Sequence, residues 1–190
     1  MEIYQVCTAV LAFLALVPLC LAQAGAEKTE AKPQPGKTQT ATSTHGATSK
    51  FVGTWKLVSI DARRPNGEAA PDRYGPNTIG FIMYDATGRM AVQIMRPARP
   101  SFASGQVDQA TPEEIKAAFD GYGAYFGTYE VHETEGFVIH HVEGSLFPNN
   151  VGTDQKRFFE LSGDQLILKP PPQQVAGEQQ IVRITWQRVK

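Results

Sequence analysis

Short segments of alternating apolar and polar residues fill the chain from residue 50 to its C-terminal end. The first, 50–60, reads KFVGTWKLVSI, and the next two, 78–84 and 89–95, flank the turn sequence DATG. Period-two alternation with many β-branched and aromatic residues is typical of strands that bury one face. The same pattern recurs in 125–133, 136–147, 155–161, 164–169 and 180–189. The chain is therefore predicted to form about eight strands.

One segment departs from this alternation and predicts a short α-helix. Thr111 is suited to the N-cap, Pro112 to the first helical position, and Glu114 to the return hydrogen bond of a capping box. Residues at helical spacing follow, namely Ile115, Ala118, Phe119 and Tyr122. Gly121 or Gly123 is expected to end the helix.

The predicted strands belong to an all-β fold. Consecutive strands joined by short turns favour an eight-stranded antiparallel up-and-down β-barrel, because closure removes exposed strand edges. Eight strands is also about the number at which a barrel interior can hold one small ligand. A β-sandwich is the alternative arrangement of the same strands.

The first 50 residues differ in composition from the rest of the chain. Residues 1–24 hold an apolar run followed by the small-residue sequence AQA, which predicts a cleaved export signal with no stable membrane span after processing. A retained N-terminal anchor and a lipoprotein signal are the alternatives. Residues 25–50 lack large apolar side chains and are predicted to be a disordered linker. The barrel domain is assigned to 51–190, in a secreted or periplasmic protein.

Cysteine usage and charge exclude several classes of function. Both cysteines, Cys7 and Cys20, lie in the predicted signal, so the mature domain would have no disulfide, thiol nucleophile or zinc thiolate. The formal net charge is −1 and no basic run stands out, which argues against nucleic acid as a partner. No phosphate loop, dinucleotide fingerprint or Ser-His-Asp arrangement appears, so no cofactor is expected.

The predicted first strand carries Gly53, Thr54 and Trp55 in the segment FVGTWKLVS. This Gly-x-Trp sequence resembles the opening strand of lipocalins and fatty-acid-binding proteins. The resemblance implies that Trp55 closes one end of the barrel and that an arginine of the last strand lies across its ring. That arginine would be Arg188 or, as the alternative, Arg183, and the contact would gain cation–π attraction.

Longer segments resemble the lipocalin-like domain of many bacterial and some fungal proteins. They comprise 80–105, 111–131 and 140–161, and the resemblance covers nearly all of 51–190. It implies a calycin-type β-barrel. It implies little about activity, because most members carry no established one, although some barrels of similar type act as cyclases or isomerases.

Two neighbouring histidines and a glutamate are candidates for chemistry. Successive side chains of a strand point to opposite faces, so His141 and Glu143 share one face, and His140 and Val142 share the other. The first pair is the candidate catalytic couple, with Glu143 orienting an imidazole that transfers a proton. A structural hydrogen bond or a ligand contact is the alternative, and if His140 faces inward it inherits any role. The pair supplies too few ligands for a metal site.

Candidate ligand-binding residues are spread over several strands. Arg96 could pair with a ligand carboxylate or phosphate, or hold a loop by pairing with Glu143 or Asp120. Tyrosines, which combine an apolar body with a polar tip, suit the wall of a cavity for an amphipathic ligand. The other candidates are Tyr84, Tyr129, His140 and Trp186.

Three functional hypotheses follow from these features. The favoured one is an exported barrel that binds a small apolar or amphipathic molecule in its interior. The second is a cofactor-free isomerase, cyclase or hydrolase, in which Arg96 or Tyr129 stabilises an oxyanion beside His141. The third is an envelope protein that binds other proteins through its loops, which a large exposed apolar patch would favour.

Overall fold

The computed structural model of the protein describes residues 49–190 except residue 176. The predicted signal, 1–24, and nearly all of the predicted linker, 25–50, lie outside the described residues, so both stay predictions. In the described part, no helix has both the length and the hydropathy of a membrane span. The elements are β1 (Gly53–Arg63), β2 (Ile79–Tyr84), β3 (Arg89–Met95), the 3₁₀ helix η1 (Val107–Gln109), α2 (Pro112–Asp120), β4 (Tyr122–His132), β5 (Phe137–Ser145), the 3₁₀ helix η2 (Pro148–Asn150), β6 (Asp154–Ser162), β7 (Gln165–Lys169), β8 (Gln173–Val175) and β9 (Glu178–Arg188).

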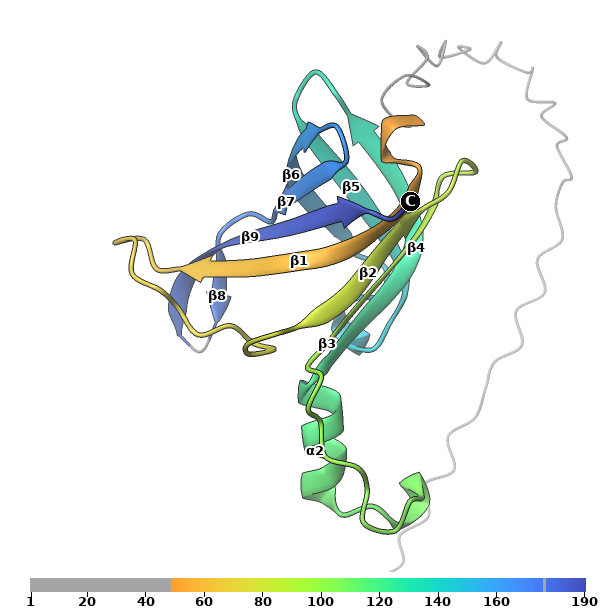
Figure 1. The fold of residues 1–190 in the computed structure, drawn as a ribbon, viewed down its shortest axis with the longest axis vertical. Coiled ribbons are helices and arrows are strands. Elements are labelled where there is room, and N and C mark those ends of the chain that lie inside the picture. Colours follow the sequence, from red (N-terminus) through yellow and green to blue (C-terminus); the bar gives the residue numbers. More distant parts are fainter. Residues whose placement is uncertain (1–48, 176) are drawn as a thin grey trace, which may run out of the picture. The chain divides into compact units, whose positions relative to one another are not determined.

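Eight of these strands close into an antiparallel barrel (Figure 1). Strands β1 to β7 pair in chain order, β9 pairs with β7, and β9 also pairs with β1 to complete the ring. The short strand β8 pairs with the first residues of β9 and lies outside the ring. The predicted up-and-down barrel is confirmed, and the sandwich alternative is wrong.

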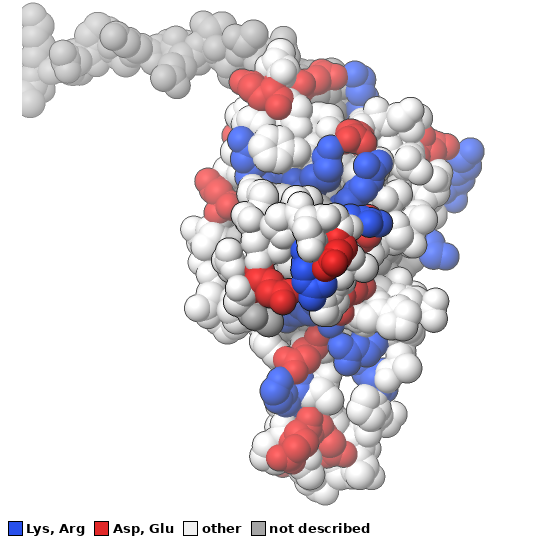
Figure 2. All heavy atoms as spheres, turned by 90° about the vertical axis from the view of Figure 1, so that its left-hand side faces the viewer, with Lys and Arg blue, Asp and Glu red and all other residues white. Residues whose placement is uncertain are grey.

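Alternating burial positions the core inside this ring. In β2 every second residue is buried and the residues between are exposed, as a strand with one dry face requires. The inward side chains form one cluster of apolar and aromatic residues, which includes Phe51, Trp55, Leu57, Ile82, Tyr84, Met90, Val92, Tyr129, Val131, Val138, Leu166, Leu168 and Trp186. On the face of the molecule that Figure 2 shows, basic and acidic side chains are interspersed.

The turn between β2 and β3 is fixed by its own side chains. The carboxylate of Asp85 accepts hydrogen bonds from the backbone N–H groups of Thr87 and Arg89, at 2.8 and 2.9 Å. These bonds lower the pKa of Asp85. Gly88 follows with a φ of +88°, a conformation that glycine adopts without strain. The predicted turn at DATG therefore sets the register of this hairpin.

The predicted capping box begins helix α2. Thr111 accepts from the backbone N–H of Glu114 at 3.3 Å, and the Glu114 carboxylate accepts from the backbone N–H of Thr111 at 2.8 Å. Pro112 is the first helical residue, and Gly121 caps the C-terminal end. Tyr122, expected at helical spacing, is instead the first residue of β4. The helix has no buried residue and extends beyond the ends of β3 and β4 (Figure 1).

Trp55 closes the barrel at the end where β1 begins. Its side chain is fully buried, and its indole N–H donates to the carbonyl of Phe51 at 2.8 Å. The guanidinium carbon of Arg188 lies 4.0 Å from the centre of the Trp55 ring. The alternative partner, Arg183, lies on the outer surface, where it contacts the carboxylate of Glu160 at 3.4 Å. The stacked arginine is therefore the one that directly ends β9.

Two hydrogen bonds and an ion pair with Asp164 at 3.5 Å also hold Arg188 in this position. Its guanidinium donates to the backbone carbonyls of Val52 and Lys50, both at 2.6 Å. Gly53 has a φ of +136°, and a Cβ added there would lie 2.8 Å from Nη1 of Arg188. The glycine of the Gly-x-Trp sequence thus leaves the space that the guanidinium occupies.

Replacing Arg188 with methionine should destabilise the barrel while keeping an apolar side chain beside Trp55. The change removes two hydrogen bonds and the cation–π contact, so we expect the free energy of unfolding to fall by about 2 kcal/mol. Urea unfolding monitored by tryptophan fluorescence measures this loss. Arg183→Met is the matched control on the same strand and should cost less than about 0.5 kcal/mol. Equal losses in the two variants would contradict the role given to Arg188.

Candidate functional site

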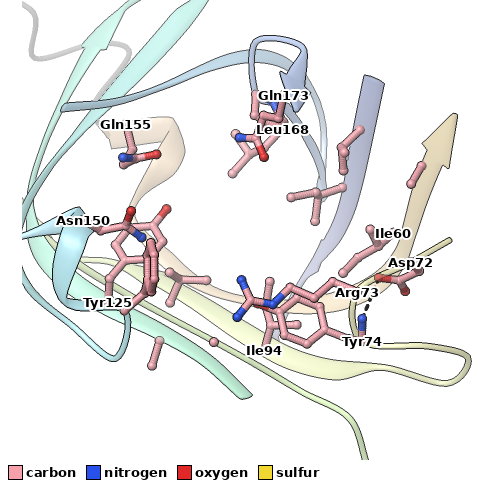
Figure 3. Close-up of a pocket in the computed structure, with 18 of the residues that line it drawn as sticks. Ile60, Asp72, Arg73, Tyr74, Ile94, Tyr125, Asn150, Gln155, Leu168 and Gln173 are labelled. Carbon is pink, nitrogen blue, oxygen red and sulfur yellow. Dashed lines mark hydrogen bonds between the residues drawn. The ribbon is translucent and has the colours of Figure 1, made fainter. Parts of the chain in front are cut away.

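A cavity of about 600 Å³ lies inside the barrel, at the end where β1 finishes. On β1 it is lined by Ile60 and Ala62 and not by Trp55, so it lies away from the closed end. Figure 3 shows that the side chains around it come from several strands and from the loop between β1 and β2. Its apolar wall includes Ile60, Ile82, Val92, Ile94, Leu168, Val182 and Ile184.

The loop 71–74 borders the mouth of this cavity. Asp72 accepts a hydrogen bond from the backbone N–H of Tyr74 at 3.0 Å (Figure 3). The Tyr74 hydroxyl lies against β4, where a Cβ added to Gly123 would be only 2.1 Å from its oxygen. Glycine at position 123 therefore allows the loop to lie this close to the barrel.

Arg96 is not among the residues that line the cavity. Its Nε donates to the carbonyl of Tyr74 and its Nη2 to the carbonyl of Arg73, both at 3.0 Å. This position agrees with the alternative expectation, an arginine that holds a loop, although its partners are backbone carbonyls rather than Glu143 or Asp120. Arg96 thus shapes the mouth indirectly by fixing the loop.

A buried chain of three side chains reaches the cavity from the core. The Tyr84 hydroxyl lies 2.8 Å from Nε2 of His140, and the Tyr125 hydroxyl lies 2.8 Å from Nδ1 of the same ring. These residues come from β2, β5 and β4, and the His140 side chain is 0% exposed. Of the three, only Tyr125 lines the cavity (Figure 3).

Burial keeps all three groups of this chain uncharged at neutral pH. It lowers the pKa of His140 well below the ordinary value, and the nearby charge of Arg157 lowers it further. Burial also raises the pKa values of Tyr84 and Tyr125. A neutral imidazole has one N–H donor and one nitrogen acceptor, so it can donate a hydrogen bond to one of the two hydroxyls and accept one from the other.

His141 and Glu143 lie on the outer face of β5. Nδ1 of His141 is 2.7 Å from the Asp154 carboxylate, and Glu143 accepts from Arg89 at 2.7 Å. The inward residues of the strand are Val138, His140 and Val142. The expectation that His141 and Glu143 point into one cavity is therefore wrong, because an ionised carboxylate is costly to bury, whereas His140 has two hydrogen-bond partners inside. Neither His141 nor Glu143 lines the cavity, so the predicted catalytic pair has no place in it.

The predicted ligand-binding aromatic residues differ in their access to the cavity. Trp186 lines it. Tyr129 is packed in the core, and its hydroxyl donates to the carbonyl of Asp85 at 2.8 Å. Tyr84 packs against Tyr129 with the ring centres 4.8 Å apart and does not line the cavity. Its connection to the cavity is the pair of hydrogen bonds through His140 to Tyr125.

The polar residues that line the cavity without having been predicted include Gln155 and Arg157 of β6. These two alternate with exposed or partly exposed neighbours and share the inward face with Phe159 and Leu161, which pack against the core. The period-two pattern of 155–161 could have identified them. Arg157 donates to the carbonyl of Lys156 at 2.8 Å and to Oε1 of Gln155 at 3.3 Å.

The arrangement as a whole suits the binding of an amphipathic molecule. A largely apolar wall surrounds the space, and polar side chains meet it from β4 and β6 and also from the loop 71–74, β5, η2, β8 and β9. Within residues 49–190 as described, no three histidine, cysteine, aspartate or glutamate side chains are grouped to hold a metal ion.

Comparison with known proteins adds two findings. A family model described as "Lipocalin-like domain" matches residues 52–189. A curated relative, the 4'-hydroxy-3'-methoxypropiophenone carrier protein ppsC of Aspergillus oryzae, is 36% identical over 107 residues. This alignment covers 53% of the present chain and 96% of the relative.

Two solved structures show a distant likeness. A bovine odorant-binding protein in complex with a selenium-containing odorant matches with a TM-score of 0.39 and 12% identity, over 87% of this chain and 78% of the other. The REP1-NXSQ fatty acid transporter matches with a TM-score of 0.34 and 13% identity, over 75% of this chain and 98% of the other.

Proposed function

The chain belongs to the lipocalin-like domain family, and we propose that its barrel binds and carries a small amphipathic molecule. The cavity is the observation that carries this proposal. Its volume of about 600 Å³ falls within the range of roughly 300–1,000 Å³ that is typical of small-molecule sites. An apolar wall supplies affinity by removing ligand surface from water, and the few polar groups fix orientation.

The curated relative supports the same kind of ligand. Its name gives it as a carrier protein for 4'-hydroxy-3'-methoxypropiophenone, an aromatic ketone with polar substituents. A compound of this class has an apolar ring for the wall and oxygen atoms for the polar residues. We propose a small aromatic compound as the ligand class of the present barrel.

Binding can be tested with the neutral fluorescent probe N-phenyl-1-naphthylamine. We expect its fluorescence to rise when it enters the barrel and to fall when unlabelled aromatic ketones displace it. Val182 lines the cavity, so Val182→Trp places an indole in the space the probe needs. Such a substitution should weaken probe binding at least about tenfold, since displaced apolar contacts of this size are worth more than about 1.4 kcal/mol.

Ile181→Trp is the matched control, because Ile181 is the neighbouring residue on the outer face of β9 and is 48% exposed. It should bind the probe as the unmodified protein does. The proposal fails if the unmodified barrel does not bind the probe, or if both tryptophan variants bind it equally well. Circular dichroism confirms that each variant is folded.

A further inference from the structure

The hydrogen-bond pattern around His140 determines which way the buried protons point. Among the described residues, the Tyr84 hydroxyl has His140 as its one hydrogen-bond partner. If it accepted from Nε2–H, its own proton would be buried without an acceptor, which costs about 1–3 kcal/mol. Tyr84 therefore donates to Nε2, and the neutral ring carries its proton on Nδ1.

This tautomer makes Tyr125 a hydrogen-bond donor to the cavity. Nδ1–H of His140 donates to the Tyr125 oxygen, so the Tyr125 hydroxyl proton is left for another acceptor. Tyr125 lines the cavity, and Figure 3 shows its ring beside the enclosed space. The buried histidine thus fixes the polarity of a group that a ligand would meet.

Arg157 adds a second donor at the same place. Tyr125 and Arg157 both line the cavity, and the charge of Arg157 lowers the pKa of Tyr125 against the larger, opposing effect of burial. Arg157 makes no ion pair with any described residue, and the one acidic residue lining the cavity, Asp72, accepts from the backbone of the mouth loop. A partly buried guanidinium keeps unused N–H groups after its two hydrogen bonds to Lys156 and Gln155.

The indole N–H of Trp186 is a third hydrogen-bond donor. Trp186 lines the cavity, and its buried Nε1 has no hydrogen-bond partner in the described structure. An indole N–H can only donate. Tyr125, Arg157 and Trp186 therefore all have O–H or N–H groups to donate, whereas the lining amides of Asn150, Gln173, Gln174 and Gln180 can both donate and accept. A ligand atom that meets Tyr125 and Arg157 would have to be an acceptor.

We infer that Tyr125 and Arg157 together recognise a carbonyl-type oxygen, of a ketone or a carboxylate, at one end of the ligand. The inference rests on the proposed binding function and adds to it the chemistry of the ligand's polar end. An sp² oxygen has two lone pairs, so it can accept from the Tyr125 hydroxyl and the Arg157 guanidinium at once. Hydrogen bonds to the charged guanidinium are the stronger of the two kinds.

Four naphthalene compounds of similar size test this recognition. They are the ketone 2-acetonaphthone, the acid 2-naphthaleneacetic acid, the hydrocarbon 2-ethylnaphthalene and the amine 2-(2-naphthyl)ethylamine. Each competes with N-phenyl-1-naphthylamine for the unmodified, full-length protein. We expect the ketone or the acid to bind at least about fivefold more tightly than the hydrocarbon, and the ammonium compound to bind most weakly. If the ketone and the acid both bind no better than the hydrocarbon, the inference is overturned, although the probe itself still binds.

Two substitutions identify the residues responsible and show whether each recognises the oxygen of a carboxylate or of a ketone. Arg157→Gln should weaken binding of the acid about tenfold or more and that of the ketone less, whereas Tyr125→Phe should weaken the ketone about fivefold. The matched controls are Arg183→Gln on the outer surface and Tyr129→Phe in the core, and neither should change the preference. Circular dichroism shows that each variant is folded, and the affinity of each variant for the neutral probe is measured first, so that each competition is referred to its own probe affinity. Preferences unchanged in both test variants would overturn the inference.

Discussion

Replacing Trp55 with alanine is expected to lower the free energy of unfolding by about 4 kcal/mol, within the range typical of a fully buried tryptophan. The side chain is 0% exposed and closes one end of the barrel. Its removal opens a cavity, breaks the hydrogen bond to the Phe51 carbonyl and leaves Arg188 without the ring on which it lies. Urea unfolding followed by far-ultraviolet circular dichroism measures the loss.

Phe81→Ala provides the control for loss of a large aromatic side chain. Phe81 lies on the outer face of β2 and is 43% exposed, so we expect a cost below about 1.5 kcal/mol. If Trp55→Ala cost no more than this variant, the closure of the barrel by Trp55 would not be a main source of its stability. A loss of about 4 kcal/mol would be a large part of the 5–15 kcal/mol typical of a folded domain.

The barrel is expected to lose stability as the pH falls below about 6.5, the ordinary pKa of histidine. Burial holds the pKa of folded His140 well below that value, with Arg157 and His141 contributing by charge. Between the two pKa values the unfolded chain binds more protons than the folded one, so acidification favours unfolding. The free energy of unfolding should fall by up to about 1.4 kcal/mol per pH unit in this window.

Comparison with His140→Gln isolates this contribution from other titrating groups. At pH 7.5 the variant should be less stable by about 1–3 kcal/mol, because glutamine replaces the imidazole between two tyrosine hydroxyls. Between pH 7.5 and 5.5 it should lose less stability than the unmodified protein does. His141→Gln, on the outer face of the same strand, should keep most of the pH dependence, because burial, the largest cause of the lowered pKa of His140, is unchanged. Parallel pH profiles for the unmodified protein and His140→Gln would contradict the assignment.

The fold could be predicted from the sequence because its signals are local. Alternation along each segment, the DATG turn and the capping box at Thr111 each specify their own element. Closure needed one long-range inference, which the Gly-x-Trp sequence supplied through Trp55 and Arg188. The resulting barrel has the expected strand order, with β8 as an additional short strand.

The site was harder to predict because it depends on which face of each strand is inside. Both faces of 137–143 mix apolar and polar residues, so alternation alone does not distinguish His140 from His141. The charge of Glu143 was the useful signal, since an ionised carboxylate belongs in water unless it is paired. Arg157 was missed for the opposite reason, because arginine is seldom expected on an inward face.

The seam between β1 and β9 affects how the molecule is made. Eight residue pairs join these strands, from Trp55 with Arg188 to Arg63 with Ile181. A ribosome releases β9 after the other strands, so β1 can pair with β2 early but its other edge has no partner until β9 emerges. Until the last strand emerges, both borders of the growing sheet are open to pairing with other chains. Closure of the barrel therefore waits for β9 to leave the ribosome, and until then the open edges of the sheet favour aggregation.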